Sequence, residues 1–390
     1  MTLCRSVMLV LACTLLMGSI ASGRTITVGS GGHVKTIAEA ARLAKDDDVV
    51  EIASGQYHGD VAVWSQKRLT IRGVGDRPVL VAAGKHAEGK AIWVIRNGDF
   101  EIHNIEFRGA RVADANGAGI RFEKGRLRVV NCGFFDSQMG ILTADTPDAE
   151  LMVENSVFAH APQSSTAHQH HLYAGRIALL RVTGSRFFSG NHGHLLKSRA
   201  RVSDIRYNLL IDGFGGMASY EADFPNAGDV TLVGNVLGQN ANAQNQTIIA
   251  YGAEGYAWPY NSLKVVHNTL VSDGLRPAWF LRVFDALPGR PPDVLTRNNL
   301  LVGIGIFVAN VGGQHQGNYF VPSFVLGDAT LMDFSLGSTS ALRGLAVPAT
   351  AEQERLQPQF EQLVPGQLSA IPPRSVWVPG AVQSPTRRRQ

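Results

Sequence analysis

The fold is decided by a short stretch that recurs along the chain, one copy of which reads LKVVHNTLV (residues 263–271). In each copy a β-rich run leads into a bend, and a second apolar run follows it. Successive bends are 27, 24, 29, 24, 27, 33 and 31 residues apart. The residues at the bends are Asn104, Asn131, Asn155, Gly184, Asn208, Asn235, Asn268 and Asn299.

A repeat of this length, with two or three short strands and an Asn at a bend, is typical of one coil of a parallel β-solenoid. Asn suits the bend because it tolerates the left-handed backbone conformation, and its amide can hydrogen-bond the Asn of the next coil. Leucine-rich repeats usually carry a helix in each unit, and WD-type propellers need about 40 residues per blade. We therefore predict an all-β chain folded as a right-handed parallel β-helix.

The two ends of the predicted solenoid differ from its middle. Residues 25–52 read as strand, amphipathic helix and strand, with Thr36 and Glu39 spaced to form a capping box. Such a helix would cover the open end of the solenoid. The period is lost after about Asn318, so we expect the β-helix over residues 24–335 and an irregular C-terminal extension over residues 336–390.

The first residues predict an exported chain. Arg5, an apolar run over residues 7–17 and small residues before position 23 form a secretory signal peptide over residues 1–23. We therefore expect a periplasmic or secreted protein. It should have no membrane span, because no later window approaches the ~20 apolar residues that a span needs.

The charge of the chain limits the classes of partner, and its cysteine content limits how it can be stabilised. The net charge is +4, and no run of Lys and Arg occurs except residues 387–389, which disfavours nucleic acid as a partner. Once the signal peptide is removed, Cys132 is the only cysteine, so stability must come from packing rather than from an intrachain disulfide. We expect a monomer.

Equal offsets from successive bends predict which side chains stack on neighbouring coils, about 4.8 Å apart. Lys197 and Glu221 share an offset of 13 residues from their bends, and Arg199 and Asp223 share an offset of 15. Counting back from the next bend adds Tyr173 to the row of Lys197 and Glu221. Alternation along the strands predicts that His171, Leu195 and Ser219 share this outward face, and that Leu172, Leu196 and Tyr220 point into the core.

The predicted row lies in the most polar part of the chain. Five of the 12 histidines fall between positions 168 and 194, and a long insertion over residues 239–259 follows. Long excursions between coils build the walls of a groove, and aromatic rings beside polar groups suit a sugar, although the same rings could simply cover the core. The candidate substrate-binding residues are Asp223, Asn226, Tyr251, Glu254, Tyr256 and Trp258.

The cap over residues 36–41, the Gly55-Gln56-Tyr57 element and the Asn repeats resemble the pectin-lyase-like right-handed parallel β-helix superfamily. This resemblance covers nearly the whole mature chain. It implies the fold rather than one chemistry, because the superfamily includes lyases, glycosidases, epimerases, esterases and adhesive proteins.

A shorter stretch resembles the catalytic segment of the parallel-β-helix alginate lyases and chondroitinase B. It consists of Leu196-Lys197-Ser198 followed by Arg206-Tyr207-Asn208. The resemblance implies that Lys197 is the general base. This chain departs from the family pattern in three ways. The Arg-Tyr-Asn element lies two residues farther from the lysine, Arg201 replaces an asparagine, and residues 218–221 replace a later catalytic arginine.

Elimination beside a uronic acid needs a cation or metal to neutralise the carboxylate, a base to remove the C5 proton and an acid to protonate the leaving oxygen. From the residues, Lys197 or Arg199 would neutralise the carboxylate, while Tyr173 or a histidine would move the proton. We predict a lyase acting on an acidic, uronate-containing polysaccharide. The candidate catalytic residues are Lys197, Tyr173, His171, His194, Arg199 and Glu221.

Other functions remain open at this point. Glu221 and Asp223 could form the carboxylate pair of a glycosidase, whose acids lie ~5 to ~9.5 Å apart. A C5-epimerase would share the proton abstraction, and a non-catalytic solenoid would only bind polysaccharide. The pairs of Lys197 with Glu221 and Arg199 with Asp223 could also be ion pairs that stabilise adjacent coils.

No cofactor is required by the sequence. The spacing of His168, His170 and His171 offers no dependable zinc frame, so we predict no metal ligands. Calcium held by Glu221, Asp223 and Asn226 stays open, because hard oxygen ligands cluster there.

Overall fold

The computed structural model describes residues 23–164, 168–213, 215–274, 276–285, 291–308, 311–328, 332–373 and 376–385. The predicted signal peptide over residues 1–23 lies outside these ranges, apart from Gly23.

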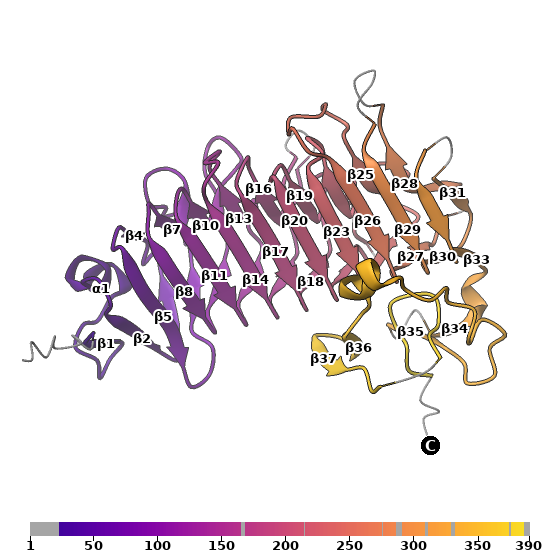
Figure 1. The fold of residues 1–390 in the computed structure, drawn as a ribbon. Coiled ribbons are helices and arrows are strands. Elements are labelled where there is room, and N and C mark those ends of the chain that lie inside the picture. The colour runs from indigo at the N-terminus through magenta and orange to yellow at the C-terminus, as the bar shows by residue number, and fades with distance from the viewer. Residues whose placement is uncertain are drawn as a thin grey trace, which may run out of the picture.

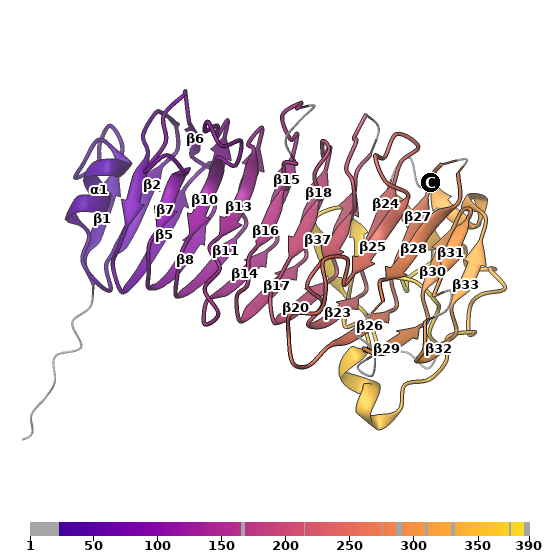
Figure 2. The same ribbon diagram turned by 90° about the horizontal axis from the view of Figure 1, so that it is seen from above.

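The chain winds into a solenoid whose walls are three parallel β-sheets, and each full coil adds one strand to sheets A, B and C in turn (Figures 1 and 2). The prediction of a right-handed parallel β-helix is confirmed.

Sheet A has twelve strands: β1 (Thr25–Val28), β2 (Val49–Ala53), β5 (Arg68–Val74), β8 (Asp99–His103), β11 (Arg126–Val130), β14 (Glu150–Glu154), β17 (Leu179–Thr183), β20 (Val202–Arg206), β23 (Asp229–Val233), β26 (Ser262–Val266), β29 (Asp293–Arg297) and β32 (Gln314–Gln316). Sheet B has eleven strands: β3 (Gln56–His58), β6 (Val79–Val81), β9 (Glu106–Arg108), β12 (Gly133–Phe135), β15 (Val157–Ala159), β18 (Arg186–Phe188), β21 (Leu209–Ile211), β24 (Val236–Gln239), β27 (Thr269–Ser272), β30 (Leu300–Val302) and β33 (Tyr319–Val321). Sheet C has ten strands: β4 (Ala62–Trp64), β7 (Ala91–Ile95), β10 (Ala118–Phe122), β13 (Met139–Thr143), β16 (Leu172–Ala174), β19 (Leu196–Ser198), β22 (Ala222–Phe224), β25 (Thr247–Tyr251), β28 (Ala278–Val283) and β31 (Gly305–Phe307).

The core is built from equivalent residues stacked on successive coils. In sheet A, strands such as β11 and β14 alternate buried and more exposed side chains, which is the pattern expected when one face of a sheet lines the interior. In sheet B four Phe rings stack with centroids 5.1, 4.7 and 4.6 Å apart, because paired residues of parallel strands lie directly above one another. These rings belong to Phe107, Phe134, Phe158 and Phe187.

The bend between sheets A and B carries a buried ladder of Asn side chains. At each step the Oδ1 of one Asn accepts the backbone N–H and the Nδ2–H of the Asn on the preceding coil. The predicted hydrogen bonding between coils is therefore confirmed. The ladder consists of Asn208, Asn235, Asn268, Asn299 and Asn318, and Ser185 and Ser156 continue it toward the N-terminus.

The left-handed residue of the bend corrects the sequence alignment. Asn104, Asn131 and Asn155 have φ of 55°, 53° and 48° and so occupy it themselves. Gly184 also occupies it, with φ of 63°, but from Tyr207 onward the left-handed residue precedes the ladder Asn, as Tyr207 does with φ of 57°. Asn satisfies either position, since it tolerates positive φ and can also bond neighbouring coils, so its recurrence alone cannot distinguish them. Counting from Asn therefore misaligned the two halves by one residue.

The N-terminal end of the solenoid is covered by helix α1 (Ile37–Leu43), which contacts β1 and β4 (Figure 1). The predicted capping box is present, with the Thr36 hydroxyl accepting the Glu39 N–H at 3.2 Å. The Asp60 carboxylate accepts the N–H groups of Ile37 and Ala38, the first two residues of the helix, at 2.6 and 2.9 Å. These contacts confirm a capping helix at this end.

Beyond β33 the chain folds back along the outside of the solenoid (Figure 1). Val378 and Val382 pack on residues of sheet B, and Leu356 packs on Tyr207 and Val233 beside sheet A. The elements of this C-terminal segment are η1 (Ser323–Val325), β34 (Leu326–Asp328), β35 (Asp333–Leu336), η3 (Ala351–Leu356), β36 (Phe360–Val364) and β37 (Gln367–Ala370). Within the described ranges, no helix is both long and apolar enough to cross a membrane.

Candidate functional site

A row of polar side chains crosses three coils on sheet C. Strand pairing places Tyr173 of β16 beside Lys197 of β19, and Lys197 beside Asp223 of β22. The predicted neighbourhood of Tyr173 and Lys197 is confirmed. The third member was predicted as Glu221 and is Asp223 instead. The connection from Ile211 to Ala222 is three residues longer than the equivalent connection from Phe188 to Leu196. The one-residue misalignment of the bends offsets one of these, so the predicted position falls two residues short.

Glu221 is fully buried and lies away from this row. Its Oε2 accepts a hydrogen bond from Gln239 at 3.4 Å. Burial, with a further contribution from Asp212, raises the pKa of Glu221 well above its usual range. Burial also raises the pKa of Asp212 to about 6. The predicted pairing of Lys197 with Glu221 is therefore wrong.

Replacement of Glu221 by Gln tests this assignment through stability. The unfolded chain ionises Glu221 above its ordinary pKa, while the folded chain retains the proton, so the wild-type protein loses stability as pH rises. Glu221→Gln removes this loss, and its Tm relative to wild type should be higher at pH 8 than at pH 5. Thermal unfolding at the two pH values measures the difference. For the exposed control Glu352→Gln, the difference in Tm from wild type should be the same at pH 5 and pH 8. If the difference for Glu221→Gln is also the same at the two pH values, the assignment is contradicted.

The inward and outward positions near this row also need correction. Leu172 and Leu196 lie in the core as predicted, but Leu195 does too. His171 is buried, and its Nε2 donates to the Phe188 carbonyl at 2.9 Å. Ser219 is buried and accepts a hydrogen bond from Asn245, while Tyr220 stacks on His194 with ring centroids 4.7 Å apart. Strict alternation fails here because His171, Leu195, Ser219 and Tyr220 lie in the turns that precede β16, β19 and β22 rather than in the strands.

Two cations meet one carboxylate at the centre of the site. Lys197 Nζ lies 3.1 Å from Glu254 Oε1, and Arg199 Nη2 lies 2.6 Å from Glu254 Oε2. Lys197 is 9% exposed, whereas the Glu254 side chain is 47% exposed. Burial would raise the pKa of Glu254, but the Arg199 and Lys197 contacts prevail and lower it. The site therefore holds one ionised carboxylate between two positive groups.

Arg199 also organises the residues around it. Its Nε donates to the Tyr173 hydroxyl at 2.8 Å, and its Nη1 donates to Asn226 Oδ1 at 2.6 Å. Burial works to lower the pKa of Arg199, but the contacts with Glu254 and Tyr173 outweigh it and raise the pKa. Arg199 thus joins Tyr173, Asn226 and Glu254, and the predicted pairing of Arg199 with Asp223 is not formed.

Asp223 binds Lys197 and His194 instead. Its Oδ2 lies 3.5 Å from Lys197 Nζ and 3.2 Å from His194 Nε2, and its side chain is almost fully buried. Burial lowers the pKa of His194 against the opposing effect of Asp223, so the ring is neutral at pH 7. Its Nδ1 accepts the Tyr220 N–H at 3.2 Å, so its Nε2 carries the proton and donates to Asp223.

His170 is a member of the site that the sequence prediction did not include. Its ring lies 4.7 Å from the His194 ring and 5.3 Å from the Tyr173 ring, and its Nδ1 accepts the His194 N–H at 2.8 Å. Burial lowers the pKa of His170 well below its ordinary value, with further lowering by His194 and Lys197. The clustering of His168, His170 and His171 signalled this segment, but not which ring would face the row.

The predicted aromatic wall is only partly formed. Trp258 is half-buried and donates its Nε1–H to the Arg199 carbonyl at 3.2 Å. Tyr256 is half-buried and bonds the Phe284 carbonyl at 2.9 Å. Tyr251 is wrongly predicted as a groove residue, since it is fully buried in the core and its hydroxyl bonds Gly228.

The calcium ligands considered from the sequence do not fit the observed arrangement. Glu221 lies apart, Asn226 Oδ1 is bonded to Arg199, and Asp223 is paired with Lys197 and His194. Within the described part of the chain, no group of three or more His, Cys, Asp or Glu is arranged to hold a metal ion.

No family model matches the chain, and neither does any curated protein. Among solved structures, pectate lyase Pel9A is similar, with a TM-score of 0.60 at 13% identity over 94% of this chain and 97% of that chain. An alginate lyase from Paenibacillus sp. str. FPU-7 matches with a TM-score of 0.48 at 12% identity over 76% of this chain and 99% of that one. The PL6 family alginate lyase AlyGC matches with a TM-score of 0.38 at 12% identity over 88% and 57%. The match to Pel9A shows that the two chains share the parallel β-helix fold.

Proposed function

We propose that this protein is an exported polysaccharide lyase that cleaves an acidic, uronate-containing polysaccharide by β-elimination. The observation that carries the proposal is the Glu254 carboxylate, which is held at once by Lys197 and Arg199. A uronate carboxylate presents the same two oxygens. Since Glu254 is half-exposed, a substrate carboxylate can take its place between the two cations.

The cations would prepare the substrate for proton abstraction. Neutralising the uronate carboxylate lets the negative charge that develops at C5 spread onto it, which lowers the barrier to removing the C5 proton. Lys197 suits this role rather than that of the base, because its ammonium group already faces the carboxylates of Asp223 and Glu254. Arg199 can hold the same carboxylate with a planar pair of N–H groups.

Tyr173 is the proton carrier that the geometry supports best. The neutral His194 has both ring nitrogens engaged, and His171 is bonded to a carbonyl of sheet B. The Tyr173 oxygen contacts Arg199 Nε, which would stabilise negative charge there. As the phenolate, it would take the C5 proton and pass it to the leaving oxygen. The C4–O bond breaks and a C4–C5 double bond forms, so the proton count balances.

A hydrolase that uses Glu221 and Asp223 has less support from the geometry. Glu221 is bonded to Gln239 in the interior, and Asp223 is bonded to His194 and Lys197, so the two carboxylates do not face each other across a groove. A C5-epimerase would use the same cations and proton carrier, and its product distinguishes it.

The proposal is tested by incubating the protein with alginate, polygalacturonate and chondroitin, with calcium and with a chelator. We expect ultraviolet absorbance from C4–C5 unsaturated uronate on at least one polymer. New reducing ends without that absorbance would indicate hydrolysis, and inverted C5 centres without chain cleavage would indicate epimerisation. Absence of any product would leave polysaccharide binding as the remaining function.

The matched variant in this assay is Lys197→Ala, which should lower kcat/KM by about 10²- to 10³-fold because one of the two carboxylate-binding charges is lost. The control Lys124→Ala removes an exposed ion-paired lysine elsewhere and should leave turnover unchanged. If Lys197→Ala lowers Tm strongly but retains activity, Lys197 serves as an ion-pairing residue of the scaffold instead.

A further inference from the structure

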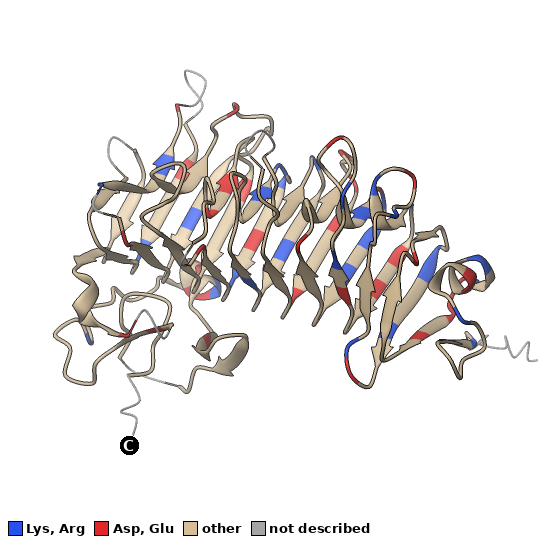
Figure 3. Cartoon of the chain, turned by 180° about the vertical axis from the view of Figure 1, so that it is seen from behind, with Lys and Arg blue, Asp and Glu red and all other residues tan. Residues whose placement is uncertain are grey.

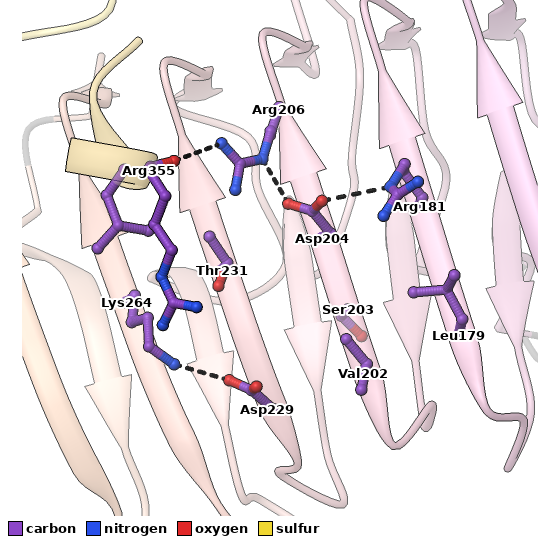
Figure 4. A pocket seen from close by; sticks show the side chains of 11 residues that line it. Leu179, Arg181, Val202, Ser203, Asp204, Arg206, Asp229, Thr231, Lys264 and Arg355 are labelled. Carbon is purple, nitrogen blue, oxygen red and sulfur yellow. Dashed lines mark hydrogen bonds and ion pairs between the residues drawn. The ribbon is translucent and has the colours of Figure 1, made fainter. Parts of the chain in front are cut away.

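A pocket lies on a different wall of the solenoid from the Tyr173 row. It opens on the outer face of sheet A, across β17, β20, β23 and β26, and has a volume of about 160 Å³ (Figure 4). Residues of η3 from the C-terminal extension line it as well. The charged side chains of the lining are Arg181, Asp204, Arg206, Asp229, Lys264 and Arg355, and Leu179, Val202 and Thr231 also line it.

The C-terminal extension creates this pocket. Leu356 is buried against Tyr207, Val233 and Val266, which fixes η3 over the sheet. The Arg206 Nη1 donates to the backbone carbonyl of Arg355 at 3.3 Å and ties the same segment down. An outward sheet face that would otherwise be open to water thereby gains a wall.

The floor of the pocket follows from strand register. Arg181, Asp204, Thr231 and Lys264 are paired in one row across four coils. Because Thr231 is uncharged, the ion pairs divide into two groups on either side of it. Asp204 bonds Arg181 and Arg206 on one side, and Asp229 bonds Lys264 at 2.8 Å on the other (Figure 4).

The pocket carries more positive than negative charge. Four cations line it against the two carboxylates of Asp204 and Asp229. Elsewhere on sheet A, Arg126 is paired with Glu150 and Arg72 with Glu51, and positive and negative residues alternate along the solenoid in the view of Figure 3. The guanidinium of Arg355 has no ion pair or hydrogen bond among the described residues. Arg181 contacts Asp204 through its Nε alone.

We propose that this pocket binds one acidic sugar ring, with its carboxylate held by Arg355 and Lys264. The free N–H groups of Arg355 and Arg181 favour an anion. The side chains of Leu179 and Val202 offer an apolar surface to the C–H face of a sugar ring. The volume is below the range of about 300–1,000 Å³ that holds drug-sized ligands, so it suits a single ring. This site would anchor a polymer away from Lys197, and it stands whether or not the protein is a lyase.

The test uses sodium glucuronate as the probe and the double variant Lys197→Ala/Arg199→Ala as the protein, so that the row on sheet C does not contribute. Calorimetry should show saturable 1:1 binding of glucuronate that weakens as salt is added, and no binding of glucose. Arg355→Glu should weaken glucuronate binding by at least roughly tenfold, because it reverses a charge in contact with the carboxylate. Its backbone carbonyl, which Arg206 uses, is unchanged.

Arg126→Ala is the matched control, since Arg126 is an exposed arginine of the same sheet face outside the pocket, and it should leave binding unaltered. Lys264→Met provides a second variant within the pocket and should also weaken binding. The proposal fails if glucuronate does not saturate the protein, if glucose binds equally well, or if neither Arg355→Glu nor Lys264→Met weakens binding.

Discussion

Replacing Tyr173 by Phe should lower kcat for β-elimination by about 10²- to 10⁴-fold while Tm stays within a few degrees of wild type. The range is that of a lost general acid–base group. The ring is retained beside Lys197 and Arg199, and among the described residues the hydroxyl hydrogen-bonds only Arg199, so little stability should be lost. Initial rates of unsaturated-product formation and thermal unfolding of the same preparation measure the two quantities.

Tyr220→Phe is the control for this substitution. Tyr220 stacks on His194 at the edge of the same site, but its ring rather than its hydroxyl makes the described contacts. We expect its kcat to remain close to wild type. If Tyr173→Phe retains most of its activity, the C5 proton moves through another group, and the assignment of Tyr173 is wrong even if the protein is a lyase.

Replacing Asn268 by Ala should lower the free energy of unfolding by about 3–5 kcal/mol. The Asn268 Oδ1 accepts two hydrogen bonds from Asn235, and its Nδ2 donates to the Leu232 and Val266 carbonyls. All of these groups are buried, and the substitution leaves donors and acceptors without partners where water cannot replace them. Urea unfolding followed by circular dichroism measures the loss.

The matched control is Asn131→Gly at the bend of an earlier coil. Asn131 is exposed and has positive φ, a conformation that Gly adopts without cost. Its side-chain hydrogen bonds to Arg77 and Asn104 can be replaced by water, so we expect a loss of at most about 1 kcal/mol. Equal losses for the two variants would show that the buried ladder adds no more stability than the exposed bend.

Some features of the fold and of the site followed from sequence because they depend on residues close in the chain or on adjacent coils of nearly equal length. Tyr173 and Lys197 lie 24 residues apart, and strand pairing brings them together as predicted. The helix cap was predictable from Thr36 and Glu39, since a capping box involves residues three positions apart. That Asp223 is the third member of the row was not predictable, because the turn before β22 differs in length from the turn before β19.

The repeated bend determined the parallel β-helix by itself, because each coil must bury the same inward face against its neighbours and only a recurring local pattern can do so. The tertiary structure alone decided which distant polar groups join the pair of Tyr173 and Lys197 and which line the sheet A pocket. Glu254 reaches Lys197 and Arg199 from a turn two coils later, and Arg355 reaches sheet A from the folded-back extension. Turn lengths vary freely at the surface, whereas strand pairing fixes register in three dimensions, so counting along the chain cannot locate such contacts.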